Sequence, residues 1–426
     1  MSAFLSDAIR VMLRGSRTYG LWVALLLLMI AVGIWHYGLQ LRDGLIVTHL
    51  SNQVSWGFYI ANFAFLVGVA AAAVLLVVPA YIFHRKDVKD VVLLGDTMAV
   101  AAVVMAILFV IVDLGRPDRL WHMLPGIGQF NFPTSLLAWD VVVLSGYLIL
   151  NLGISYYIVY KHYLGRKPKE RSYFPLVVVA MFWAISIHTV TAFLFSANSG
   201  RAYWSDPLLA PRFIASAFAS GPALSILALM VIRRMTRYPV RQTVIDTLAI
   251  TMAIALQVSL FFVIAELFTE FYNEGWHAAS TRYLYFGLHG HAVLQPWIWT
   301  ALAMLVVALG IVMIHPLRKN PRLLLVACLL TAIGVWIEKG MALVIPGFVP
   351  TPLGEIFEYM PNANEVWVAV GVWGVGLLVF TVLAKVGIAV ECGEIGRRSV
   401  CEREPLAEPT FKGGGSPAAV LAAPAE

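Results

Sequence analysis

Long apolar segments alternate with short polar ones along almost the whole chain. A helix needs about 20 mostly apolar residues to cross the ~30 Å hydrocarbon core of a bilayer. Ten segments reach that length, at residues 20–40, 56–83, 91–112, 135–159, 174–196, 211–231, 242–269, 293–314, 322–342 and 365–390. We therefore predict an all-α, polytopic membrane protein with ten transmembrane helices.

Basic residues are shared unevenly between the two alternating sets of connections. Of the 30 Lys and Arg residues, 22 fall in one set and 7 in the other, and Lys385 lies inside the last span. Because cytoplasmic loops carry the excess of positive charge, we expect a cytoplasmic (inner) membrane protein with both termini in the cytoplasm. The 113–134 loop then lies outside. Scattered basic residues also argue against a nucleic-acid partner.

Spans two to five and six to nine resemble each other in sequence. "DTMAVA" at Asp96 matches "DTLAIT" at Asp246, and "LFVIVDL" matches "FFVIAEL", with offsets of 150 to 154 residues. This second match aligns Asp113 with Glu266. An even number of helices per copy gives both copies the same orientation, so we predict two four-helix bundles plus flanking helices.

The repeat divides the chain into five predicted regions. They are 1–55 (N-terminal cytoplasmic segment, first transmembrane helix and outer loop), 56–210 (first four-helix bundle), 211–342 (second four-helix bundle), 343–390 (outer loop and tenth helix) and 391–426 (tail). The tail is rich in Gly, Pro and Ala, a composition that predicts disorder on the cytoplasmic side.

"IVDLGRPDRLWHM" at residues 111–123 brings charged groups to the outer end of the third span. Gly115 and Pro117 end that helix. We interpret Asp113 as a general base, Arg116 as its counter-charge and His122 as a proton relay to solvent. The alternative is an interfacial turn held by an ion pair between Asp113 and Arg116.

Three more spans bring polar or aromatic groups to the same depth. Trp56 and Tyr59 open the second span, Trp139 and Asp140 fall early in the fourth, and His188 lies in the outer half of the fifth. Aromatic faces beside acid and imidazole groups suit a flat, lipid-soluble ring that bears two oxygens. A haem held by His36 and His188 is a weaker alternative, because no pair of histidines falls at mid-bundle.

A second group of ionisable residues falls in the second bundle. Glu266, Glu338 and Lys339 form a candidate proton path, and together with Asp113 they would make the relay of a channel or transporter. The alternative function is therefore a proton channel or transporter subunit without quinone chemistry of its own. A pure transporter should carry ionisable groups near the midplane, and the central thirds of these spans are almost free of charge.

At these motifs the chain resembles the NrfD, or polysulfide reductase membrane subunit, family. The resemblance rests on "WGFYIANFAFLVGVAAAA", on "DLGRPDRLWHM" followed by "NFPTSLLAW", and on "IPGFVPTPLGEIFEYMPNANE". Ten spans and the late Pro-rich loop are most similar to the DsrP type of that family, which belongs to a sulfite-reduction complex.

The resemblance implies a quinone-interacting subunit with no haem or metal in this chain. It implies menaquinone as the quinone, a periplasmic four-cluster iron-sulfur protein as the partner, and further cytochrome and membrane subunits in the same bilayer. The long, uncharged outer loops fit docking of such a partner. The quinone is expected near Asp113, and Asn62, Trp121 and Arg116 join the expected quinone-binding residues.

Overall fold

The computed structural model describes residues 1–70, 74–124, 126–272, 275 and 278–396, so most of the predicted tail lies outside the described residues. Within this part the chain is helical, with no β-strand, and ten helical segments are long and apolar enough to span a membrane. The prediction of an all-α protein with ten spans is thereby confirmed. The spans are Arg17–Asp43 (α2), Phe58–Ala70 with Val74–Tyr81 (α3 and α4), Val92–Asp113 (α6), Leu136–Tyr163 (α7), Glu170–Ser196 (α8), Leu209–Met235 (α9), Gln242–Tyr272 (α10), Gln295–Met313 (α12), Pro321–Phe348 (α14, Pro321–Trp336, and its continuation) and Ala363–Glu391 (α16).

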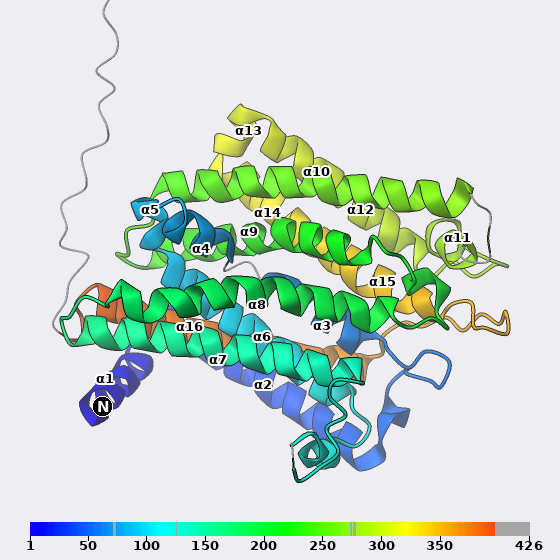
Figure 1. Cartoon of the computed structure of the whole chain (residues 1–426), viewed down its shortest axis with the longest axis horizontal. Coiled ribbons are helices and arrows are strands. Elements are labelled where there is room, and N and C mark those ends of the chain that lie inside the picture. The colour runs from blue at the N-terminus through cyan, green and yellow to red at the C-terminus, as the bar shows by residue number, and fades with distance from the viewer. Residues whose placement is uncertain (71–73, 125, 273–274, 276–277, 397–426) are drawn as a thin grey trace, which may run out of the picture.

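Eight of the spans pack as two groups of four that run side by side (Figure 1). In the first group α3, α6, α7 and α8 contact one another in ring order. In the second, α9, α10, α12 and α14 follow the same order, as the predicted repeat requires. The groups meet where α3 and α8 pack on α9. The domain boundaries drawn from the sequence stay a prediction.

The remaining two spans, α2 and α16, pack against each other, and α16 joins the pair to the first group through α6. Gly33 and Gly371 make this contact close, since a Cβ atom on Gly33 would collide with the Cα atom of Gly371. Small residues at a crossing allow two membrane helices to approach in this way. Only Leu26, Gly33 and Gln40 of α2 are buried, so most of this helix faces lipid.

The two ends of the bundle differ in their connections (Figure 1). Short helices α1 (Ser2–Leu13), α5 (Lys86–Lys89) and α13 (His315–Lys319) lie at one end. The other end carries longer loops with the helical turns η1 (Leu45–Val47), η3 (Pro117–Met123) and η4 (Ala202–Trp204) and helix α11 (Ala278–Phe286). The hydroxyl of Tyr163 on α7 donates to Asp7 of α1 at 2.8 Å. Which end faces the cytoplasm stays a prediction.

The ninth span contains a π-helical turn, Ile337–Met341, directly after α14. The span continues as α15 (Ala342–Val344) and a 3₁₀ turn at Ile345–Phe348. Glu338 and Lys339 both lie in the π turn and both are buried. An extra residue in one helical turn changes which side chains face inward, and such turns are frequent at functional sites.

Candidate functional site

Asp113, the last residue of α6, lies in a cluster of polar side chains where α2, α3, α6 and α16 meet. One of its carboxylate oxygens, Oδ1, is buried and has no hydrogen-bond partner among the described residues. Asp113 interacts electrostatically with Glu365 and with Tyr59. The structure therefore brings two of the predicted site residues, Asp113 and Tyr59, into one cluster.

Gln40 joins the flanking helix α2 to this cluster. Its side-chain N–H donates to the carbonyl of Val112 at 2.6 Å, and its carbonyl oxygen accepts from the Tyr59 hydroxyl at 2.9 Å. A buried amide costs free energy unless both of its ends are hydrogen-bonded, and both are. Gln40 was not among the residues predicted from the sequence, although a lone amide in an apolar span was a usable signal.

Glu365 adds a second carboxylate from the start of α16. It is fully buried and accepts from the backbone N–H of His49 at 3.1 Å and of Asn362 at 3.0 Å. The hydroxyl of Tyr359 donates to Glu365 and accepts from the N–H of Phe58 at 2.9 Å. Burial, and next the Glu365 carboxylate, raise the pKa of Tyr359, so this phenol stays a neutral donor.

The charged turn after Asp113 is arranged differently from the expectation. Arg116 forms two 3.0 Å hydrogen bonds with Asp118, and both side chains are exposed. The predicted ion pair between Arg116 and Asp113 is therefore wrong. The cause is local, because Pro117 opens the η3 turn and Asp118 presents its carboxylate to the guanidinium two residues away. Hydrogen bonds from Arg116 lower the pKa of Asp118.

His122 and Trp121 lie in the same turn and are exposed, with ring centroids 3.9 Å apart. The ring contact of His122 is thus with its neighbour in the turn and does not link it to Asp113. The relay role of His122 stays a prediction.

Three other predicted residues have separate partners. Trp56 stacks on Trp204 with centroids 5.6 Å apart, and Trp139 donates to the carbonyl of Pro133 at 2.8 Å. His188 is buried and bonds through Nδ1 to the carbonyl of Ala184 at 2.9 Å. The contacts of these three side chains do not join them to the Asp113 cluster.

An apolar groove of about 290 Å³ lies between α3, α9, α14 and α16. Asn62 holds two of its aromatic walls, since its side-chain oxygen accepts from the indoles of Trp336 at 3.1 Å and Trp373 at 3.0 Å. Phe58 and Val366 also line the groove. The groove therefore adjoins the Asp113 cluster, because Phe58 is bonded to Tyr359 and Val366 follows Glu365.

The predicted proton-path residues lie in the second group of helices, around a cation that was not predicted from the sequence. Arg212 of α9 donates through Nε to Glu338 at 2.8 Å and also pairs with Glu266. Lys339 donates to the carbonyl of Phe213 at 3.0 Å. Glu266 and Glu338 are thus brought together around Arg212, and Lys339 is a second buried cation beside Glu338.

The expectation that this chain carries no haem or metal stays a prediction. In the described ranges no three His, Cys, Asp or Glu side chains are grouped so that they could hold a metal ion. His36 hydrogen-bonds Asn364 of α16 at 2.9 Å and stacks on Trp367, whereas His188 lies in α8. The two histidines of the haem alternative therefore have different neighbours.

The fold and the polar cluster define a ten-span membrane protein with a buried carboxyl site at one set of helix ends. A family model described as polysulphide reductase, NrfD, matches residues 46–351. The chain belongs to this family.

Similar proteins include membrane subunits of reductases. The chain is 26% identical over 396 residues to a putative dimethyl sulfoxide reductase membrane subunit of Halobacterium salinarum, covering 84% of this chain and 88% of that protein. It is 23% identical over 400 residues to a selenate reductase subunit of Mesobacillus selenatarsenatis, covering 83% and 90%. It is 28% identical over 215 residues to the Hdr-like menaquinol oxidoreductase integral membrane subunit of Archaeoglobus fulgidus, covering 50% and 51%.

Proposed function

We propose that the chain is the quinone-interacting membrane subunit of a respiratory electron-transfer complex. It exchanges electrons between a membrane quinone, menaquinone in the first instance, and a periplasmic iron-sulfur partner. The observation that carries the proposal is the Asp113 carboxyl, whose buried Oδ1 has no hydrogen-bond partner in the described chain and which lies in a polar cluster that adjoins an aromatic groove. Family membership and the names of the reductase relatives support it.

The polar cluster suits the proton chemistry of such a site. A quinol bound there supplies two electrons and two protons as it is oxidised. Asp113 holds or releases one proton at its unbonded Oδ1. Gln40 fixes Tyr59 beside it, and Glu365 is held by backbone N–H groups and Tyr359. Asp113 interacts electrostatically with Glu365, so a second carboxyl lies in the same polar cluster as the proposed base.

The groove suits the isoprenoid tail of the quinone rather than its ring. Its lining is almost wholly apolar, and the amide of Asn62 is already hydrogen-bonded to Trp336, Trp373 and the carbonyl of Phe58. Asn62 therefore acts on the ligand indirectly, by fixing the two indole walls.

Exposed apolar residues on the loops at the Asp113 end support a partner that docks there. Ile46, Ile127 and Leu353 are 86%, 70% and 87% exposed, each on a different loop. Exposed apolar side chains on loops outside the membrane mark candidate interaction surfaces. A partner on this face would lie directly above the Asp113 cluster, so electrons need not cross the bilayer.

Three finer assignments belong to the same proposal. The chain is of the DsrP type and serves sulfur metabolism, as its motifs suggest. It lies in the inner membrane with both termini in the cytoplasm, as its basic residues suggest. Glu266, Glu338 and Lys339 form a linked proton path, which the buried network around Arg212 supports. Purification of the native complex, with identification of its subunits and co-extracted quinone, tests these assignments.

The groove offers a direct test of the function. Val370 lines it, and we expect Val370→Trp to raise the KM for a long-tailed quinol while leaving the KM for a short-tailed analogue unchanged. Ile149→Trp, on a lipid-exposed position of α7, is the matched control and should change neither. Equal effects of Val370→Trp on both quinols would contradict tail binding. Proton flux through liposomes that hold this chain alone, without quinone, would favour the channel alternative.

A further inference from the structure

A second buried carboxyl, Asp96, lies near the opposite end of α6 from Asp113. Seventeen residues of α-helix separate the two, or about 25 Å. Asp96 is buried, with 5% of its surface exposed. In the described chain its carboxyl has no hydrogen-bond or ion-pair partner. An ionised carboxylate buried without a partner is costly, so Asp96 is suited to carry a proton.

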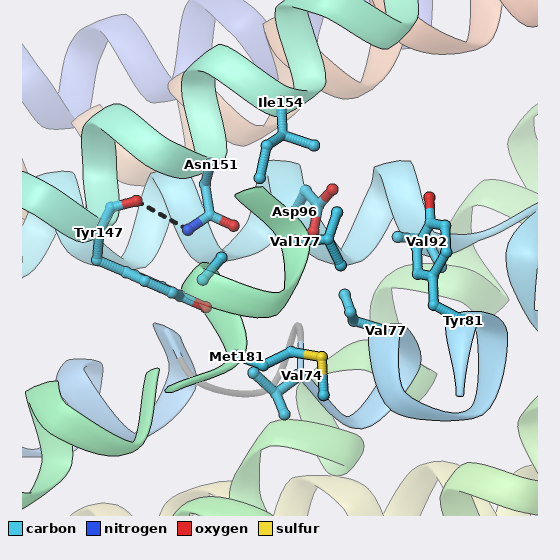
Figure 2. Close-up of a pocket in the computed structure, with 11 residues that line it drawn as sticks. Val74, Val77, Tyr81, Val92, Asp96, Tyr147, Asn151, Ile154, Val177 and Met181 are labelled. Carbon is cyan, nitrogen blue, oxygen red and sulfur yellow. Dashed lines mark hydrogen bonds between the residues drawn. The ribbon is translucent and has the colours of Figure 1, made fainter. Parts of the chain in front are cut away.

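Asp96 lines a small cavity together with Tyr147, Asn151 and Tyr81 (Figure 2). The cavity has a volume of about 20 Å³, which is room for one water molecule. A buried water needs two to four polar partners, and these four side chains offer a carboxyl, an amide and two phenols. The cavity can therefore hold a water in contact with the Asp96 carboxyl.

Polar groups extend from this cavity toward the nearer membrane face. The ring of Tyr81 packs edge-on against Tyr173 at 5.9 Å, and Lys89 lies over Tyr81 at 5.3 Å. Lys89 is exposed and pairs with Glu170 at the surface. Tyr81 thus lines the cavity and also contacts Lys89, which reaches the surface.

In the other direction the cavity approaches Lys339. The Tyr147 hydroxyl donates to the carbonyl of Ala70 at 3.2 Å. Two residues earlier on α3, a Cβ atom on Gly68 would lie 3.1 Å from the ammonium nitrogen of Lys339. His188 also interacts electrostatically with Lys339. Tyr147 and Lys339 thus both contact α3, at positions two residues apart along that helix.

The position that matches Asp96 in the second bundle is Asp246, and its surroundings are different. Asp246 is more exposed and forms a 2.9 Å ion pair with Lys319. No cation faces Asp96 from the described neighbouring helices. The titratable groups near it are Tyr81 of α4 and Tyr147 of α7, while Lys385 of α16 lies over Tyr19 instead.

We propose that Asp96 is a proton-carrying residue that takes protons from the membrane face opposite Asp113 and passes them toward Lys339. The carboxylate accepts a hydrated proton that arrives from the membrane face opposite Asp113 and becomes a neutral acid. It then passes that proton to the cavity water on the Tyr147 side, so one proton enters and one leaves. No electron moves in this step. The link to turnover rests on the proposed function, but the protonation of Asp96 does not.

Infrared difference spectroscopy on the full chain tests the protonation itself. We expect a C=O stretching band of a protonated carboxylic acid that shifts in D₂O and disappears in Asp96→Asn. Asp246→Asn is the matched control and should keep the band. If Asp96→Asn leaves every protonated-carboxyl band in place, Asp96 is ionised and the inference is wrong.

Proton uptake by the assembled complex in vesicles tests the route. With quinol as donor, Asp96→Asn should lower the rate of proton uptake by at least about tenfold. Asp246→Asn is the matched control and should leave the rate unchanged, and Tyr81→Phe is a second probe of the route. Tyr81→Phe should lower uptake to a smaller degree. Unchanged uptake in Asp96→Asn would overturn the route. A wild-type complex that transfers no electrons from quinol would instead refute the proposed function, and the infrared result would still decide the protonation of Asp96.

Discussion

The two four-helix groups carry carboxyl side chains at matching positions, but among the described residues only those of the second group have cationic partners. In the first, Asp96 and Asp113 lack a cationic partner in the described chain. In the second, Asp246 pairs with Lys319, and Glu266 pairs with Arg212. The packing order of the helices is the same in both groups, so the difference lies in single side chains.

This difference gives the carboxyl side chains of the two groups different surroundings. A charge inside a membrane is costly unless it is paired. The second group places a cation beside the carboxylate at each matching position, so a proton that follows the proposed path there has to pass through groups that are already ion-paired. In the first group Asp96 and Asp113, one near each end of α6, have no cationic partner in the described chain, and these are the two carboxyls that we propose exchange protons.

The largest expected effect is on turnover. Asp113→Asn keeps the shape of the side chain but removes the base, so electron transfer from quinol should fall by about 100-fold or more. Glu266→Gln, at the matching position, should lower the same rate much less. Steady-state assays on fully assembled complexes at equal concentration give both numbers. If the two variants fell equally, the contrast between the groups would have no catalytic meaning.

The next effect is on stability. Arg212→Met leaves Glu338 and Glu266 buried without their cation, and breaking such a buried pair costs about 3–5 kcal/mol. Thermal unfolding of the purified protein in detergent should show a clear loss. The double replacement of both glutamates by glutamine in the Arg212→Met background should recover part of it. A variant as stable as the wild type would show that these charges are not locked together.

A smaller effect is expected at Asp246. Its pair with Lys319 is partly exposed, and exposed pairs contribute at most about 1 kcal/mol. A double-mutant cycle with Asp246→Asn and Lys319→Met should therefore give a coupling energy below that value. A much larger coupling would mean that this carboxylate is as tightly fixed as Glu266.

The smallest effect depends on pH, at the junction of the two groups near α5. Burial tends to raise the pKa of Asp87, but hydrogen bonds from Arg85 and Thr243 outweigh it and lower the pKa. A lowered pKa stabilises the fold above the unfolded value of about 4, and this contribution disappears as pH falls through the folded pKa. Asp87→Asn should thus reduce the melting temperature slightly at pH 7, and the difference from the wild type should shrink as the pH falls below about 4. A difference that grew toward pH 3 would contradict the assignment.

The sequence predicted the spans because length and apolar composition decide them without tertiary detail. It also placed Asp113 at a helix end, because Gly115 and Pro117 follow it. It could not assign the partners of Arg116, since several acids lie within reach of a flexible guanidinium. Gln40 and Glu365 were missed because residues more than 300 positions apart meet through the packing of α2 on α16.

The π turn shows a second limit of sequence reasoning. A continuous α-helix would place Glu338 and Lys339 about 100° apart, so a helical wheel predicts that one of them leaves the interior. In the structure both are buried. Helices α3 and α12 both contact this turn, and all five residues of Ile337–Met341 are buried.

The close contact between Gly33 and Gly371 sets the angle at which α2 crosses α16, and this angle determines where Gln40 lies in the Asp113 cluster. Gln40 lies seven residues beyond Gly33, about 10 Å along the helix. A tilt of about 10° at the crossing would displace Gln40 by roughly 2 Å, enough to break its 2.9 Å hydrogen bond to Tyr59. A single methyl group added at Gly371 would therefore weaken the hydrogen bond that positions Tyr59 in the proposed proton site, although Gly371 itself lies outside that site.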